Sequence, residues 1–145
     1  MATKFLFNVT VLDGSDVQAF DYMSKGDPYV VLRFLWTDTA TRARMQPMCK
    51  RIRTTTAENQ GLTPKFNEVF SEELTTEDLL LVQVYEDDHQ KNKETEDQKN
   101  QLIGSAEISL REMVDTPGKT FEVTAVAKKE GQDQGKIRLS LCRAV

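Results

Sequence analysis

The stretch Phe5–Val11, with the sequence FLFNVTV, places an apolar side chain at every second position. Side chains on a β-strand point alternately to the two faces of a sheet, so this period predicts a strand with one buried face. A second such stretch, VVLRFLW, covers Val30–Trp36. Six further runs, some only loosely alternating, are Met48–Thr55, Phe66–Leu74, Leu80–Glu86, Ala106–Leu110, Phe121–Ala125 and Gly135–Cys142.

Turn-forming residues separate these predicted strands, for example at Gly26–Pro28 and Thr116–Gly118. No segment keeps a helical period beyond about one turn, which lies near Ser109–Val114. Many short strands at this spacing are typical of an antiparallel β-sandwich. We therefore predict an all-β fold, an eight-stranded antiparallel Greek-key β-sandwich, and a single domain over residues 1–145.

Composition narrows the class of protein. The chain has 145 residues, which suits one domain, and 39% of them are apolar, which is enough for a core. Its longest apolar run, Tyr29–Trp36, falls well short of the ~18 residues of a membrane span and contains Arg33. The first residues lack the length and cleavage site of a signal peptide. These features predict a cytoplasmic protein, and a net charge of −4 argues against nucleic-acid binding.

Charge is distributed unevenly along the chain. Thr39–Ala57 contains no acidic residue, whereas Glu86–Asp97 contains six acidic residues and two lysines. The basic residues of the first segment are Arg42, Arg44, Lys50, Arg51 and Arg53. Separated blocks of opposite sign predict two surfaces with different electrostatic roles, although two solvated faces would give the same pattern.

Alternating strand directions bring distant carboxylates together. If each strand crosses the domain once, the first and fifth connections leave it at the same end. The first connection contains Asp21 and Asp27, and the fifth begins with Glu86 and Asp88. Four clustered carboxylates repel each other unless a cation lies between them. Oxygen ligands in loops suit Ca²⁺ better than Mg²⁺, and the absence of nearby histidine or cysteine disfavours zinc. Acidic loops that serve solubility alone are the alternative.

Four short motifs resemble those of one known family. They are FDYMSKGDPYV at residues 20–30, LTPKFNE at 62–68, VYEDD at 84–88 and LIG at 102–104. In this order they are similar to the first calcium-binding loop, the L-N-P-x-[WF]-N-E motif, the third loop and a strand start of C2 domains. Thr63 replaces the asparagine of the second motif. The first motif directly follows the first predicted strand and a last strand closes the chain, which resembles the type II topology of that family.

The resemblance implies Ca²⁺ ligands in the first and third loops. The implied ligands are the carboxylates of Asp21, Asp27, Glu86 and Asp88 and the backbone carbonyls of Phe20 and Asp87. Glu86 replaces the usual aspartate, and Gln101 stands where the family has its fifth acidic ligand. The third loop is longer than usual, so Asp97, Glu96 or Glu94 could replace the missing ligand. A set with fewer charged ligands predicts weaker binding, or one fewer ion, than in the strongest family members.

The resemblance also implies Ca²⁺-dependent docking to an anionic phospholipid membrane, because the ion cancels the negative charge of the loops. Arg51 and Arg53 share one face of the predicted third strand, and Lys50 points to the other face. These three residues are the predicted contact to phosphoinositide, and Tyr22 and Met23 of the first loop are the predicted apolar contacts. A solvated sheet face explains the basic residues equally well.

A Ca²⁺-independent C2 domain that binds other proteins is the alternative function. Catalysis is not expected, because a single histidine, His89, provides no triad and no acid–base pair. We expect a monomeric, cytoplasmic signalling module that becomes peripheral to the membrane on calcium binding and has no nucleic-acid partner.

Overall fold

The computed structural model describes residues 4–17, 27–37, 44–57, 63–75, 77–87 and 101–145, with the backbone alone at residues 37, 44–50 and 101. Its elements are β1 (Phe5–Ser15), β2 (Pro28–Thr37), β3 (Arg44–Arg53), β4 (Lys65–Leu74), β5 (Leu79–Glu86), β6 (Gln101–Ser109), α2 (Arg111–Val114), β7 (Thr120–Lys129) and β8 (Gln132–Arg143). The predicted eight-stranded, all-β fold is confirmed, and α2 lies where the sequence shows its single helical turn.

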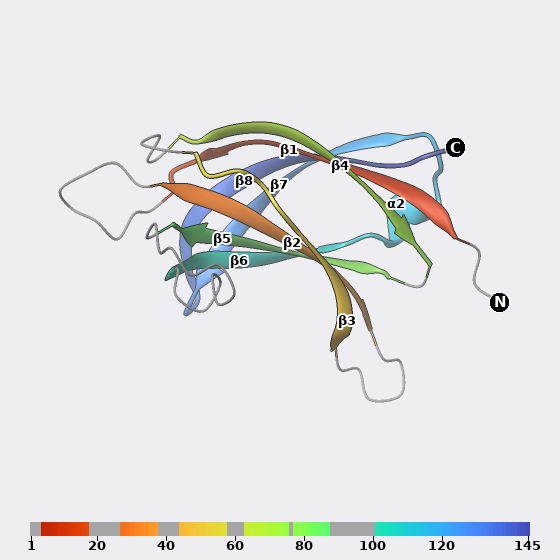
Figure 1. Cartoon of the computed structure of the whole chain (residues 1–145), viewed down its shortest axis with the longest axis horizontal. Coiled ribbons are helices and arrows are strands. Elements are labelled where there is room, and N and C mark those ends of the chain that lie inside the picture. Colours follow the sequence, from red (N-terminus) through yellow and green to blue (C-terminus); the bar gives the residue numbers. More distant parts are fainter. Residues whose placement is uncertain (1–3, 18–26, 38–43, 58–62, 76, 88–100) are drawn as a thin grey trace.

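The strands form two packed layers (Figure 1). The continuous order is β3-β2-β5-β6-β7-β8-β1-β4, and every pairing is antiparallel. Strands β6 and β7 share a single pair, Ser105 with Lys128, so the sheet opens there into a β3-β2-β5-β6 layer and a β7-β8-β1-β4 layer. The last strand pairs with the first along most of its length, as expected for a chain that its final strand closes.

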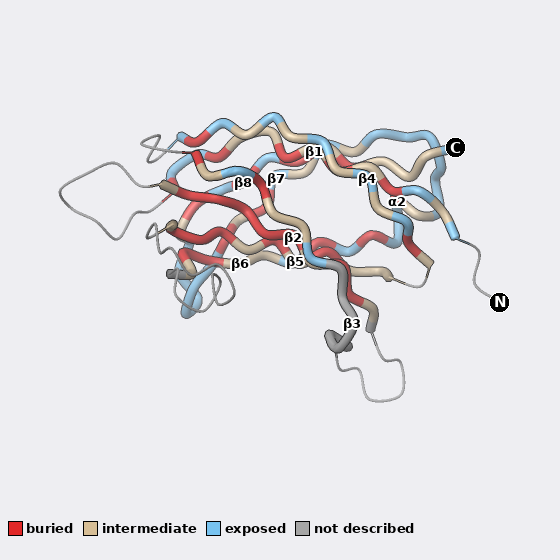
Figure 2. Tube along the Cα trace, in the orientation of Figure 1, coloured by how far each residue is buried: buried red, intermediate tan, exposed pale blue. Residues whose placement is uncertain are grey.

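The core lies between the two layers (Figure 2). Phe7, Val9 and Val11 of β1 are fully buried, as the period of two predicts. The ring of Phe7 meets the ring of Phe34 on β2 edge to face, with centroids 6.3 Å apart. Each fully buried side chain of this size contributes about 1.5–3 kcal/mol relative to an exposed one. The alternating apolar positions therefore hold the two layers together.

Strand β2 is buried on both faces, which the alternation of one apolar face did not predict. Besides the core residues, Tyr29 and Val31 are fully buried in a second, smaller cluster with Tyr85 of β5 and partly buried Leu102 of β6. This cluster forms because β2 is an inner strand of its layer, so its outward side chains have neighbours on the adjoining strands.

The third strand differs from its predicted bounds. It begins at Arg44, which the sequence placed in the preceding connection, and it ends at Arg53. Beyond that point the chain still follows β2, because the Thr54 N–H donates to the Val30 carbonyl (2.9 Å) and the Ala57 N–H donates to the Pro28 carbonyl (2.8 Å). Backbone pairing with β2 fixes this segment, so apolar alternation was a poor guide to its limits.

Candidate functional site

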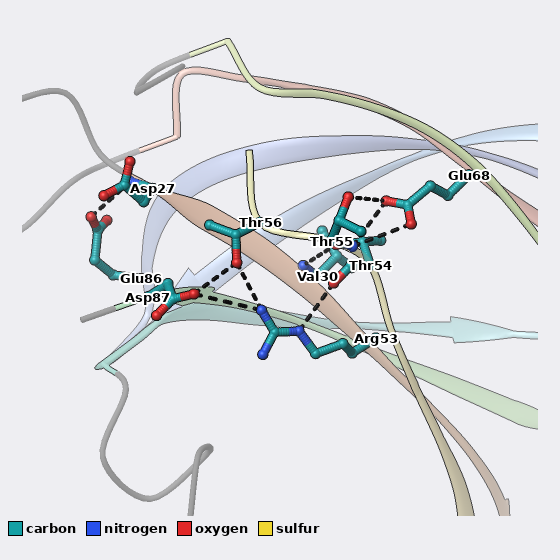
Figure 3. Close-up of polar contacts among 9 residues, drawn as sticks. All are labelled: Asp27, Val30, Arg53, Thr54, Thr55, Thr56, Glu68, Glu86 and Asp87. Atoms are coloured by element: carbon teal, nitrogen blue, oxygen red, sulfur yellow. Dashed lines mark hydrogen bonds and ion pairs between the residues drawn. The ribbon is translucent and has the colours of Figure 1, made fainter. Parts of the chain in front are cut away.

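The first and fifth connections meet at one end of the sandwich. Asp27 directly precedes β2, and its N–H donates to Oε1 of Glu86, the last residue of β5, over 2.9 Å. The Asp87 N–H donates in turn to the Asp27 carbonyl oxygen over 2.9 Å. The alternation argument is thus confirmed for Asp27 and Glu86, whose carboxylates lie beside each other (Figure 3).

The Glu86 carboxylate is largely removed from solvent. The residue is 9% exposed, and its second oxygen, Oε2, is buried as well. Burial raises the free energy of a charged carboxylate unless hydrogen bonds or a cation stabilise it. Through its bond to Asp27, the side chain joins the residue that ends the first connection to the strand that begins the fifth.

A third segment reaches the same end of the molecule. Arg53 ends β3, and its Nη2 donates to Oγ1 of Thr56 over 2.8 Å. The Thr56 hydroxyl donates to Oδ2 of Asp87 over 2.8 Å, and the direct distance from Arg53 Nη2 to that oxygen is 3.7 Å. We call Arg53, Thr56 and Asp87 the arginine brace (Figure 3). It joins the segment after β3 to the residue after β5.

Two stacked tyrosine rings pack against the arginine brace. The Arg53 guanidinium lies 3.7 Å from the centroid of the Tyr29 ring, a cation–π contact. Tyr29 stacks on Tyr85 with centroids 5.5 Å apart and planes 13° apart. Nε of Arg53 also donates to the Thr54 carbonyl over 3.0 Å. With these contacts the Arg53 side chain is only 22% exposed, so its position is fixed by several partners.

Two threonines anchor the start of the segment between β3 and β4. Oγ1 of the buried Thr54 accepts a hydrogen bond from the Val30 N–H over 2.9 Å. Thr55, which is exposed, is held from the other layer: its N–H donates to both carboxylate oxygens of Glu68, at 3.2 and 3.0 Å, and its hydroxyl donates to Oε2 over 3.0 Å. These bonds fix the backbone that carries Thr56 (Figure 3).

The remaining predicted site residues fall into two groups. Phe20, Asp21, Tyr22, Met23, Asp88 and Asp97 lie outside the described residues, and so does the side chain of Lys50. Arg51 is exposed, Arg53 is turned toward Asp87, and Ile52 packs against the core as the predicted strand face requires. Within the described ranges, no three His, Cys, Asp or Glu side chains are grouped so that they could hold a metal ion.

Sequence reasoning missed Thr56, the carboxylate of Asp87 and the Tyr29–Tyr85 stack. A signal for Thr56 was available, because the connection between the third and fourth strands is also odd-numbered and must leave the sandwich at the same end. The contact between Arg53 and Tyr29 had no such signal. Strand periodicity assigns a side chain to a face of the sheet, but it does not show which neighbours cover that side chain.

Comparison with known proteins identifies the family. A family model for the C2 domain matches residues 6–125. The chain belongs to the C2 domain family. C2 domains in general bind phospholipid membranes, and many bind Ca²⁺. No curated protein matches the chain by sequence.

Solved structures share this C2 fold at low sequence identity. The C2A domain of a plant extended synaptotagmin 1 is 21% identical with a TM-score of 0.71, over 97% of this chain and 94% of that one. Human GIVD cytosolic phospholipase A2 is 19% identical with a TM-score of 0.71, over 99% of this chain and 16% of that one. The calcium-bound C2A and C2B domains of extended synaptotagmin 2 are 18% identical with a TM-score of 0.70, over 99% and 47%.

The described part of the chain has no helix of the length and apolarity that a bilayer crossing requires.

Proposed function

We propose that this C2 domain is a binding module rather than an enzyme, and that it docks on anionic phospholipid membranes when Ca²⁺ binds between its first and third loops. The observation that carries the proposal is the contact between Asp27 and Glu86, 59 positions apart in the sequence. It sets two acidic side chains from different loops at the same end of the sandwich, beside Asp87.

The donor chemistry supports a hard cation. The acidic side chains of Asp27, Glu86 and Asp87 provide oxygen ligands only, and Ca²⁺ takes six to eight such ligands in varied geometry. Asp21 and Asp88 would complete the set, with the carbonyls of Phe20 and Asp87 and with Asp97 in place of the missing fifth acid. A bound cation supplies positive charge at this end and open positions for lipid phosphate or carboxylate.

The proposed docking is electrostatic. Without the ion, the anionic leaflet repels the acidic end; with the ion, that repulsion is removed and basic residues add ~1 kcal/mol each near the surface. Exposed Arg51, with Lys50, is the candidate contact of the basic strand to phosphoinositide. Because the third loop offers no apolar side chain from His89 to Gln101, binding to vesicles should weaken steeply as salt rises. Vesicle binding that persists at high salt would contradict this mode.

A Ca²⁺-independent protein-binding role is the second candidate, and one contact favours it. Arg53 lies 3.7 Å from Asp87, so part of the negative charge at this end is already balanced within the chain. A ligand that binds only the folded state must raise the melting temperature. An unchanged melting temperature at millimolar Ca²⁺ would therefore select this candidate.

Calorimetric titration with Ca²⁺ tests the proposal directly. Wild type should release or take up heat saturably, and a variant carrying Asp21→Asn and Asp27→Asn should not. The matched control carries Glu112→Gln and Asp115→Asn, which remove the same charge from exposed positions in and just after α2, at the other end of the sandwich (Figure 1). Control traces like wild type, with Ca²⁺-dependent sedimentation on phosphatidylserine vesicles, support the proposal. Identical traces for all three proteins defeat the site assignment.

A further inference from the structure

Two arginines of β3 stand two residues apart and have opposite surroundings. Arg51 is exposed, whereas the side chain of Arg53 is 22% exposed and contacts Thr54, Thr56, Asp87 and Tyr29. Their positions on one face of the strand suggested one shared role in lipid binding. The exposure of Arg51 and the contacts of Arg53 assign them two different roles.

The geometry of Arg53 is that of a fork held at both ends. Its Nε bonds to the Thr54 carbonyl and its Nη2 bonds to the Thr56 hydroxyl, at 3.0 and 2.8 Å. The planar group rests on the Tyr29 ring. A lysine ammonium is a point charge without this fork, so it could not make the same set of bonds. If Arg53 moved away to bind a lipid phosphate, the Asp87 carboxylate would lose its positive neighbour and would repel the Glu86 carboxylate.

Asp87 is the residue through which this arrangement reaches the loops. Its carboxylate accepts from Thr56, and its N–H donates to the Asp27 carbonyl. The brace therefore fixes the backbone at the first residue after β5, where the third loop departs. Residues that hold ligating groups in place from behind change metal affinity by about tenfold to a hundredfold when removed.

We propose that Arg53 is a positioning residue for the ion site, which fixes Asp87 and the base of the third loop, and that Arg51 rather than Arg53 is the membrane contact of β3. The inference rests on the proposed function and adds to it. The proposal predicts the direction in which Ca²⁺ affinity changes when Arg53 is removed. A nearby cation that acts only by its charge repels Ca²⁺, so removing it strengthens ion binding. A positioning residue has the opposite effect, because its removal weakens ion binding.

The experiment compares Arg53→Gln, Arg53→Lys and Arg51→Gln in the full chain, with Arg111→Gln as a charge-matched control at α2. Calcium affinity is measured by calorimetry, and Tb³⁺ luminescence excited through tyrosine provides a second readout. Both Arg53 variants should bind Ca²⁺ about tenfold more weakly, including the lysine variant that keeps the charge. Arg51→Gln and Arg111→Gln should bind Ca²⁺ within about twofold of wild type. Tighter binding by Arg53→Gln would overturn the proposal.

Vesicle binding separates the two arginines at saturating Ca²⁺. On vesicles of phosphatidylcholine and phosphatidylserine, Arg51→Gln should bind about fivefold more weakly than wild type, and Arg53→Gln should match wild type. An equal loss for both variants would restore Arg53 as a lipid contact and overturn the reassignment.

A double-mutant cycle uses Asp87→Asn: if Arg53 acts through Asp87, adding Arg53→Gln to that variant produces no further loss of Ca²⁺ affinity. Additive losses contradict it.

Hydrogen exchange at the amides of Glu86 and Asp87, measured without Ca²⁺, keeps the inference separate from the proposed function. Arg53→Gln should accelerate exchange there, and Arg51→Gln should leave it unchanged. If wild type shows no response to Ca²⁺, the proposed function fails while this measurement still decides the role of Arg53. Equal exchange in wild type and Arg53→Gln would overturn the positioning role.

Discussion

Two arginine–carboxylate clusters of this domain differ in both distance and burial: the longer ion pair is the more buried one, and the shorter ion pairs are the more exposed ones. In the arginine brace the ion pair between Arg53 and Asp87 is long, 3.7 Å, and its side chains are 22% and 18% exposed. On the outer face of the other layer, Arg138 makes short bonds to Asp13, 2.7 and 3.1 Å, and to Glu122, 3.1 Å. These side chains are more exposed, at 46%, 34% and 60%.

The location of each cluster explains what it can do. Arg138 joins β8 to β1 and β7, strands whose backbones are already paired along most of their length. Its hydrogen bonds to Asp13, the largest effect, raise the pKa of its guanidinium. Arg53 instead joins segments beyond the ends of β3 and β5, where single backbone bonds, from Thr54, Ala57 and Asp87, take the place of a continuous strand ladder. Short distances thus mark the better-formed ion pair, whereas the brace has more influence on how the loops are held.

The largest effect should come from the buried hydrogen bond next to the brace. Thr54→Val keeps the volume of the side chain but leaves the Val30 N–H without its acceptor at 2.9 Å. An unsatisfied buried donor costs about 1–3 kcal/mol, so the free energy of unfolding should fall by that amount in urea melts. Thr55→Val is the matched control, since Thr55 is exposed and its loss should be smaller. Equal losses would contradict the prediction that the buried hydrogen bond of Thr54 contributes more to stability than the exposed one of Thr55.

The next largest effect should be the loss of stability when Arg53 is replaced, compared with the loss when Arg138 is replaced. Arg53→Gln should lower the free energy of unfolding by about 1–2 kcal/mol in the presence of chelator, because it leaves partly buried polar groups without their charged hydrogen-bond partner. High salt should change this loss little, since partly buried charges are weakly screened. Urea melts at low and high salt measure it. A loss smaller than that of Arg138→Gln at both salt concentrations would reverse the comparison.

The two regions also differ in how far the sequence predicts them. Periodicity predicted that strands β1, β7 and β8 exist, but it ended β1 and β7 too early: the predicted runs Phe5–Val11 and Phe121–Ala125 are the strands Phe5–Ser15 and Thr120–Lys129, and Asp13 lay outside the predicted first strand. The brace depends on contacts between positions that are 31 residues apart, such as Thr56 with Asp87, and no local period encodes them. Alternation of strand direction did predict that Asp27 and Glu86 would share one end. It could not reveal that β2 is buried on both faces, because Tyr29 is covered by residues from other strands.

A smaller effect is expected from the hydroxyl that links the brace. Thr56→Val removes the bond to Asp87 and the acceptor for Arg53, both at 2.8 Å, while the direct pair at 3.7 Å remains. The free energy of unfolding should fall by about 1 kcal/mol, less than for Arg53→Gln. Thr56→Ser keeps the hydroxyl and should restore most of the loss. Thermal melts of both variants measure the difference, and no rescue by serine would show that the methyl group, not the hydroxyl, matters.

The smallest effect should come from the cluster with the shortest distances. Arg138→Gln should shift the Tm by less than roughly 3 °C at low salt, because exposed ion pairs contribute little, and the shift should shrink further at high salt. The raised pKa of Arg138 means that its contribution is fully present below the unfolded pKa and is lost only as pH rises through the folded value. The shift should therefore be the same at pH 6 and pH 9 as far as Arg138 titrates. A large, salt-insensitive shift would show that burial is the wrong basis for ranking the two clusters.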